Sequence, residues 1–209
     1  MLGIIRVITL PDQRDADLHG ELIRRRYGLE VTSACIEDQP EGVFDERTEE
    51  LAIPKIVLLA GELEKRGCRA IGISCAADPA LAECRQAVNV PVLGAGSCAA
   101  HLGLASVDKL GVLTILEETP PLIRSILGDA YVGMERPEGV MTTLDLRTEA
   151  GREASFRSAV KLAEQGAEGI VLACTGFATI GFAEELERRL GLRAFDPIYS
   201  LGAAAAVCL

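Results

Sequence analysis

The sequence has no tryptophan and only two histidines among its 209 residues. These histidines, His19 and His101, do not form an H-x₃-H pattern, and no two cysteines have the C-x₂₋₄-C spacing of a zinc site. A G-x-S-x-G nucleophile motif is missing as well. The sequence therefore predicts neither a metal site nor a serine catalytic triad, and it indicates no cofactor.

Clusters of Lys and Arg are also missing: 21 basic residues stand against 31 acidic ones, and the net charge is −10. Nucleic acids and anionic membranes both need a basic surface, so neither is expected as a partner. The apolar N-terminal stretch contains Arg6 and reaches Pro11 too early for a signal peptide or a spanning helix. The cysteines number seven, an odd count that favours reduced thiols. We expect a cytoplasmic protein that acts on a small molecule.

Short apolar, β-branched runs alternate with longer amphipathic segments along the whole chain. This alternation is typical of parallel sheets covered by helices on both faces. The runs expected to be strands are 3–10, 29–36, 70–75, 90–96, 110–116, 130–134, 169–174 and 193–198. The clearest helical patterns lie at 50–67, 156–166 and 182–191.

The order of these segments occurs twice. LGIIRVITLPD at 2–12 resembles LGVLTILEETPP at 110–121. KRGCRAIGISC at 65–75 resembles EQGAEGIVLAC at 164–174, each a helix end followed by a buried-type strand and a cysteine. The copies are about a hundred residues apart, which is a typical domain size. The sequence therefore predicts a duplicated α/β unit.

This duplication predicts an α/β fold of two similar, pseudo-symmetric lobes, each a parallel sheet flanked by helices. The first lobe is expected at 1–100 and the second at 101–209, with the segment 195–209 packing back on the first. Ligands of open parallel sheets bind beyond the carboxyl ends of strands, where the sequence has Cys75 and Cys174. Lobes that face each other with these ends would place the two thiols on opposite sides of an active-site cleft.

Two facing thiols fit the inversion of an acidic carbon. That reaction needs a base on one face, an acid on the other and donors for the enolate oxygen, which backbone N–H groups can supply. A helix is expected directly after each thiol, with Asp78 capping the first and Thr175 or Thr179 the second, and its N-terminus would lower the thiol pKa. His19 is expected on a helix surface. We expect the other cysteines to be small hydrophobic residues of the core: Cys35, Cys68, Cys84, Cys98 and Cys208.

A G-x-G-x-x-A stretch at 94–99 follows an expected strand and is similar to a dinucleotide-binding fingerprint. Its counterpart in the second half reads FDPIYSLGAA, and a nucleotide site here would leave the paired cysteines unexplained. We therefore do not predict nucleotide binding.

Three motifs, CAADPAL at 75–81, CTGFATIG at 174–181 and DPI at 196–198, carry a family resemblance. With the duplication, they make the whole chain resemble the aspartate/glutamate/hydantoin racemase superfamily, and the hydantoin racemase branch most. The resemblance implies a cofactor-independent racemase, commonly a homo-oligomer, that acts on 5-substituted hydantoins with Cys75 and Cys174 as the acid/base pair. It further implies substrate contacts through the main chain of Ala76, Ala77, Thr175 and Gly176. By position, loops at Pro11, Glu118 and Thr119 are expected to complete the cleft.

Other functions stay open on the same fold. One is an amino-acid racemase of the aspartate or glutamate type, although those enzymes usually carry Asn-Thr where this chain has Ala76 and Ala77. Another is a maleate-type isomerase or a decarboxylase, the latter usually with only one of the cysteines. The last is a non-catalytic protein that binds a small ligand, for which thiol alkylation would be slow and unselective. An enzyme would have one fast-reacting thiol that substrate protects.

Overall fold

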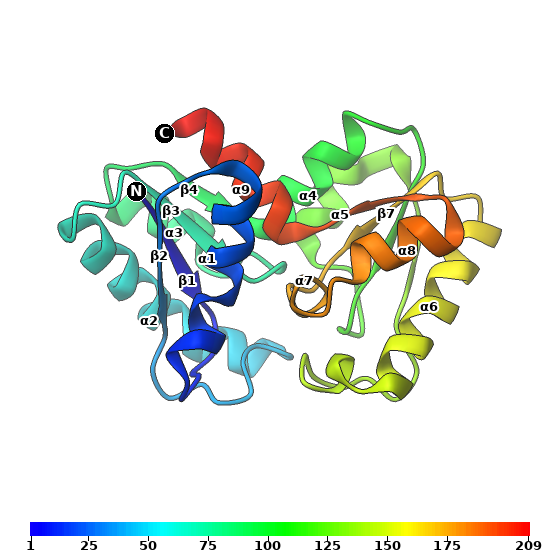
Figure 1. The fold of residues 1–209 in the computed structure, drawn as a ribbon, viewed down its shortest axis with the longest axis horizontal. Helices are drawn as coiled ribbons and strands as arrows, with labels where there is room; N and C mark the ends of the chain where they lie inside the picture. The colour runs from blue at the N-terminus through cyan, green and yellow to red at the C-terminus, as the bar shows by residue number, and fades with distance from the viewer.

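The computed structural model describes residues 1–209 as two lobes that lie side by side (Figure 1). Each lobe is built on a four-stranded parallel sheet, and the strand orders are β2-β1-β3-β4 and β6-β5-β7-β8. The first sheet contains β1 (Leu2–Arg6), β2 (Val31–Cys35), β3 (Ala70–Ser74) and β4 (Val92–Gly94), and the second contains β5 (Leu110–Leu113), β6 (Tyr131–Glu135), β7 (Gly169–Leu172) and β8 (Arg193–Phe195). Every expected strand is found, and the predicted two-lobed α/β fold is confirmed.

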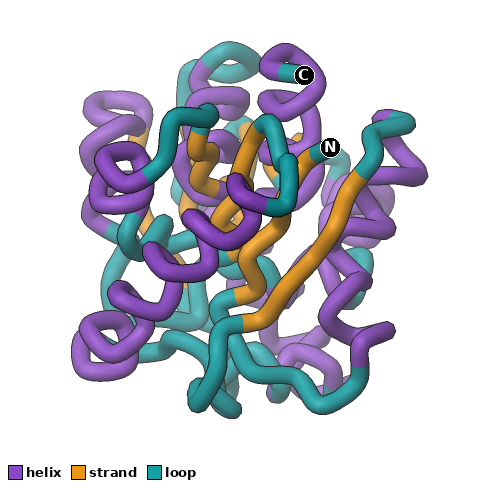
Figure 2. The backbone as a smooth tube through the Cα atoms, turned by 90° about the vertical axis from the view of Figure 1, so that its left-hand side faces the viewer, coloured by secondary structure: helices purple, strands orange, loops and turns teal.

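Helices cover both faces of each sheet. Figure 2 views the first lobe from the side, with helices around its strands. The helical patterns expected at 50–67, 156–166 and 182–191 are all found as helices. The α-helices are α1 (Gln13–Tyr27), α2 (Glu46–Lys65), α3 (Leu81–Ala87), α4 (Ala95–Leu104), α5 (Pro121–Leu127), α6 (Glu149–Glu164), α7 (Gly176–Thr179), α8 (Phe182–Leu190) and α9 (Pro197–Cys208), and two 3₁₀ helices are η1 (Gly128–Ala130) and η2 (Asp145–Arg147). None of these helices has the length and apolar character needed to cross a membrane.

The central strands are buried from end to end, which explains why they read as continuous apolar runs. All residues of β1, β3, β5 and β7 are buried. A parallel strand with helices on both sides has no solvent face, so alternation of polar and apolar residues is lost. One core lies on each side of each sheet.

Two helices are exchanged between the lobes. Helix α4 follows β4 of the first sheet but packs against β7, β8 and α5 of the second lobe, whereas α9 follows β8 of the second sheet and packs on α1, β3 and β4 of the first. Ala99 of α4 belongs to the same core as Leu110, and Leu201 of α9 to the same core as Ile4. Figure 1 shows the C-terminus beside the N-terminus on the first lobe. The lobe boundary expected at residue 100 falls inside α4, and the division into 1–100 and 101–209 stays a prediction.

Candidate active site

A cavity of about 70 Å³ lies between the lobes at the carboxyl ends of the central strands. In each sheet the strand order reverses between the first and third strands, β1 and β3 or β5 and β7, and such switch points are where open α/β sheets bind ligands. The first lobe lines it with Arg6, Val7, Ile8, Leu10, His19, Gly42, Val43, Ser74, Cys75, Ala76 and Ala77, and the second lobe with Ile115, Leu116, Thr143, Leu144, Arg147, Ala173, Cys174, Thr175, Gly176 and Thr179.

Both thiols singled out from the sequence line this cavity, one from each lobe. Cys75 directly follows β3, and Cys174 follows β7 after one further residue. Cys75 is half-buried and Cys174 is 6% exposed. The sulfur atoms are close enough that ionisation of Cys174 would disfavour ionisation of Cys75. The strand-end placement therefore brings the two cysteines together across the junction of the lobes.

Burial raises the pKa of each thiol to about 12. The backbone N–H of Ala77 opposes this rise at Cys75, and the N–H groups of Gly176 and Phe177 oppose it at Cys174. The Gly176 N–H donates to the Cys174 sulfur at 3.4 Å. The expected lowering of the thiol pKa by helix N-termini is wrong, because α3 begins only at Leu81 and α7 has just four residues. Desolvation of a thiolate outweighs the few amide donors.

Asp78 holds the segment after Cys75 against α4. Its two carboxylate oxygens accept hydrogen bonds from the N–H of Gly96 at 2.8 Å and of Ser97 at 2.7 Å. A Cβ atom on Gly96 would lie 1.9 Å from the carbonyl oxygen of Ala76, so only glycine fits there. The expectation that Asp78 caps the helix that follows it is wrong: the side chain caps α4 instead. The fingerprint-like glycine stretch thus serves to dock α4 on the Cys75 loop.

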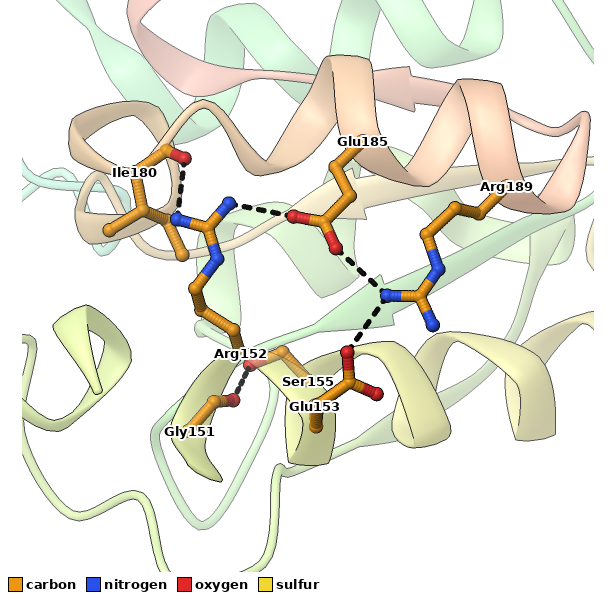
Figure 3. Close-up of polar contacts among 7 residues, drawn as sticks. All are labelled: Gly151, Arg152, Glu153, Ser155, Ile180, Glu185 and Arg189. Carbon is orange, nitrogen blue, oxygen red and sulfur yellow. Dashed lines mark hydrogen bonds and ion pairs between the residues drawn. The ribbon is translucent and has the colours of Figure 1, made fainter. Parts of the chain in front are cut away.

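The loop after Cys174 is fixed by a different network, which Figure 3 shows. Arg152 of α6 donates to the carbonyl oxygen of Ile180 at 3.1 Å, just beyond α7, and to Glu185 of α8 at 2.7 Å. Arg189 reaches the other oxygen of Glu185 at 2.8 Å. Helices α6 and α8 therefore hold the end of α7 in place beneath the cavity.

His19 is not a surface residue but the side chain that ties the lobes together at the cavity. It is 1% exposed, its Nδ1 lies 2.7 Å from the Ser74 hydroxyl and its Nε2 lies 2.9 Å from the Thr179 hydroxyl. Burial, and secondarily the charges of nearby arginines, lower its pKa well below 6.5, so the ring is neutral. The sequence carried a signal that was missed: His19 stands three residues after Ala16 and four before Ile23, on the buried face of α1.

The two threonines expected to cap helices do something else. No side-chain cap bond is made at the start of α7 or α8. Thr175 donates instead to the carbonyl oxygen of Ser74 at 3.4 Å, and Thr179 bonds His19. Both hydroxyls reach from the second lobe to the first, Thr175 directly to the strand end that precedes Cys75 and Thr179 to His19, so they help to fix the spacing of the two thiols.

Two arginines line the cavity and were not predicted as site residues. Arg6, at the end of β1, is 7% exposed, and its Nη1 donates to the carbonyl oxygens of Asp15 at 2.8 Å and Ala16 at 3.0 Å. Burial lowers its pKa to about 10. Arg147 ends η2 of the second lobe and is exposed. The 21 lining residues include no Asp or Glu.

The expected loop residues lie outside the cavity lining. Ala76, Ala77, Thr175 and Gly176 do line the cavity, but Pro11, Glu118 and Thr119 do not. Pro11 and Glu118 are exposed, and Thr119 pairs with the Tyr131 hydroxyl at 3.0 Å. The cavity ends nearer to the strands, where Leu10, Ile115 and Leu116 take these places.

The remaining five cysteines are free thiols in varied surroundings. Cys68 and Cys84 belong to the core of the first lobe, as expected. Cys35 and Cys98 are half-buried, and Cys208 is exposed near the C-terminus, so a core position for Cys208 is wrong. No group of three or more His, Cys, Asp or Glu side chains is arranged to hold a metal ion.

Two equivalent parallel-sheet lobes, with a thiol from each at one shared cavity, define a two-lobed α/β enzyme with its site between the lobes. Residues 18–205 match the model of the Asp/Glu/Hydantoin racemase family, and the chain belongs to this family. It is 28% identical over 187 residues to a hydantoin racemase of Pseudomonas sp. (strain NS671), covering 86% of this chain and 74% of that one. It is 26% identical over 189 residues to a hydantoin racemase of Rhizobium meliloti, covering 87% and 77%.

The fold is similar to that of an allantoin racemase from Klebsiella pneumoniae, with a TM-score of 0.85 and 20% identity over 99% of this chain and 86% of the other. The family resemblance inferred from the cysteine motifs is confirmed. The chain is an isomerase of the racemase kind.

Proposed function

We propose that the chain racemises a 5-substituted hydantoin without a cofactor, with Cys75 and Cys174 as acid and base on opposite faces of the Cα–H. The observation that carries this proposal is the placement of one thiol from each lobe at the same cavity. Equivalent strand ends supply two equivalent thiols. A racemase needs such a pair because it converts each enantiomer into the other.

One thiolate removes the Cα proton, and the electron pair of the broken C–H bond moves toward the adjacent carbonyl to give an enolate. The opposite thiol then delivers its own proton to the other face of Cα. The two sulfurs end with their protonation states exchanged, so no further reactant is needed. The backbone N–H groups near Ala77 and Gly176 are the nearest donors for the charge that develops.

The raised thiol pKa suits a weakly acidic carbon. A thiolate whose conjugate acid has a pKa of about 12 is a stronger base than an ordinary cysteine thiolate, so proton transfer from carbon is less uphill. The disadvantage is that only a small fraction of the enzyme molecules holds a thiolate at neutral pH.

The hydantoin class is supported by the hydantoin racemases among the relatives and by the allantoin racemase with a similar fold. Allantoin is itself a hydantoin with a ureido substituent at C5. The small side chains of Ala76 and Ala77 leave the main chain open to a flat ring. The cytoplasmic location and the homo-oligomer inferred from the sequence stay predictions.

The test follows solvent deuterium into the Cα–H position by NMR while optical rotation is recorded. The panel is a set of L-5-substituted hydantoins with aspartate, glutamate and maleate, and the proteins are wild type, Cys75→Ser and Cys174→Ser. The proposal is supported if a hydantoin loses optical activity and exchanges its Cα–H with the wild type, and if the loss of optical activity is abolished in each variant. Exchange of aspartate or glutamate alone would move the substrate to the amino-acid class.

A non-catalytic ligand-binding role is tested by alkylation with iodoacetamide in a Cys208→Ser background, which removes the exposed thiol. The racemase proposal predicts that a hydantoin protects Cys75 from modification, as read by peptide mass. Equal, slow modification with and without hydantoin, together with no exchange, would favour the binding protein.

A further inference from the structure

The charge of the cavity is opposite to the charge of the chain. The whole sequence has ten more acidic than basic residues, yet the cavity lining contains two arginines and no carboxylate. A cleft lined by one sign of charge concentrates ligands of the other sign. The lining therefore favours an anionic ligand. Neither thiol chemistry nor an uncharged hydantoin ring requires such a positively charged lining.

Arg6 retains unused donors at the site. A guanidinium has five N–H donors, and the bonds within the chain engage only Nη1. No Asp or Glu side chain forms an ion pair with Arg6, although the residue is 7% exposed. A buried cation without a counter-ion is unfavourable, and an anionic ligand would supply the missing partner. Arg6 pairs in the sheet with Ser74, the residue before Cys75, so its backbone lies beside the start of the first thiol loop.

Arg147 approaches the same cavity from the second lobe and also lacks an ion pair. The two arginine charges affect each other: burial is the main cause of the lowered pKa of Arg6, and the charge of Arg147 lowers it further. Two unpaired guanidinium groups that repel each other across one cavity match a carboxylate, which Arg binds with two parallel hydrogen bonds.

The position of Arg147 comes from an insertion that only the second lobe has. The sequences PEGV and D-x-R-T-E occur in both halves, at 40–43 and 45–49 and again at 137–140 and 145–149. The second copy has three more residues between them, and Asp145 accepts hydrogen bonds from the N–H of Met141 at 2.9 Å and Thr142 at 2.8 Å to form a compact turn. This turn leads into η2 and its arginine.

The equivalent arginine of the first copy, Arg47, lies in the exposed first turn of α2 and does not line the cavity. The duplicated motif thus has an arginine at the site in one copy only.

We infer that the substrate carries a carboxylate on its C5 side chain and that Arg6 and Arg147 bind this carboxylate from the two lobes. This inference rests on the proposed racemase function and names its substrate class: 5-(carboxyalkyl)hydantoins rather than hydantoins with neutral side chains. Arg6 and Arg147 are then specificity-determining residues, while the thiols carry the proton transfer.

The experiment compares L-5-(carboxymethyl)hydantoin with L-5-(carbamoylmethyl)hydantoin, which have nearly the same shape and differ in charge. For the wild type we expect kcat/KM to favour the carboxylate by roughly ten- to a hundredfold. Arg147→Gln should remove most of this preference, chiefly by raising KM for the carboxylate substrate. Because Arg147 is exposed, the substitution should leave folding intact, which the melting temperature checks.

Arg47→Gln is the matched control, because it changes the equivalent arginine outside the cavity and should keep the full preference. Arg147→Lys should recover part of it, since a point charge replaces the bidentate fork. Equal kcat/KM for acid and amide in the wild type would overturn the inference while leaving the racemase function in place.

Calorimetric titration of the same two hydantoins separates the two proposals. Tighter binding of the acid that Arg147→Gln abolishes, without any deuterium exchange, would support the carboxylate site and refute the racemase function on hydantoins. Equal affinity for acid and amide would overturn the carboxylate site whatever the exchange measurement shows.

Discussion

The two lobes agree at their thiols and differ in their charges. Cys75 and Cys174 follow equivalent strands in sheets of equivalent order, and each receives N–H groups from the chain just after it. Arg6 has no counterpart: it stands three residues after Gly3, and Thr114 stands three residues after Gly111. Proton transfer to either face of a carbon needs a symmetric pair of groups, whereas holding an unsymmetrical ring in one orientation needs groups that differ between the lobes. The duplication supplies the symmetric thiols, and later divergence at single positions supplies the unsymmetric charges.

The largest effect should come from breaking the symmetric part. Cys75→Ala and Cys174→Ala should each reduce racemisation by about a hundred- to ten-thousandfold, because each removes an acid/base group. Polarimetry of a hydantoin substrate measures this rate, and Cys208→Ala is the control because that thiol is exposed and does not line the cavity.

The two single variants also show whether each thiol serves its own face. Each variant should still exchange the Cα–H of one enantiomer slowly with solvent deuterium, and the favoured enantiomer should be opposite in the two. Racemisation at the wild-type rate in either variant would contradict the facing-thiol mechanism.

The pH dependence tests whether both thiols have the same high pKa. Burial raises both pKa values to about 12, so the thiolate fraction rises about tenfold per pH unit below that value. We therefore expect kcat/KM to increase about a hundredfold between pH 7 and pH 9 without a plateau. The measurement needs an N-alkylated hydantoin, whose own ionisation does not interfere. A plateau near pH 8.5 would mean that at least one thiol is not desolvated in the working enzyme.

Much of this arrangement could be predicted from the sequence because it depends on local patterns. The strands, the duplication and the two cysteines at strand ends are all visible in runs of at most a dozen residues. The buried face of α1 is visible as well, in the spacing of Ala16, His19 and Ile23, but a histidine in an amphipathic stretch is expected on the helix surface.

Other features depend on contacts distant in sequence. Nothing near Asp78 indicates that its carboxylate caps α4, 18 residues away, or that α4 and α9 exchange lobes. The thiol pKa is set by burial in the assembled lobes, which a strand-end motif does not specify. Arg147 lines the cavity and Arg47 does not, and the two segments differ by three inserted residues whose effect on the path of the chain the local pattern does not specify.

The docking of α4 on the Cys75 loop is a second difference between the two lobes. Gly96→Ala would place a Cβ atom 1.9 Å from the carbonyl oxygen of Ala76, a backbone atom that cannot rotate away. We expect a loss of about 3 kcal/mol in the free energy of unfolding, measured by urea titration, with reduced activity because the chain next to Cys75 must move.

Gly61→Ala in α2 is the matched control for this substitution. Its new Cβ meets nothing within 4 Å, so the change should stabilise the protein by about 0.5–1 kcal/mol through helix propensity. Equal stability of the two variants would mean that α4 does not pack on the loop as described.

The smallest effect concerns the acidic caps of the exchanged helices. Asp78 uses both oxygens to cap α4, whereas Asp196 caps α9 with Oδ1 alone and its buried Oδ2 has no partner. Burial raises the pKa of Asp196 to about 6. A carboxyl whose pKa is higher in the folded state stabilises the fold below its unfolded pKa of 3.8, and this stabilisation is lost as the pH rises through 6.

The free energy of unfolding of Asp196→Asn, taken relative to that of the wild type, should therefore rise by roughly 2 kcal/mol between pH 4 and pH 7. Urea unfolding at the two pH values measures it. Asp78→Asn provides the contrast. The pKa of Asp78 is also raised to about 6, but an amide cannot accept the second of its two N–H bonds, so this variant should lose stability at both pH values. Parallel pH profiles for wild type and Asp196→Asn would show that the unpartnered oxygen has no energetic consequence, and the two caps would then be equivalent after all.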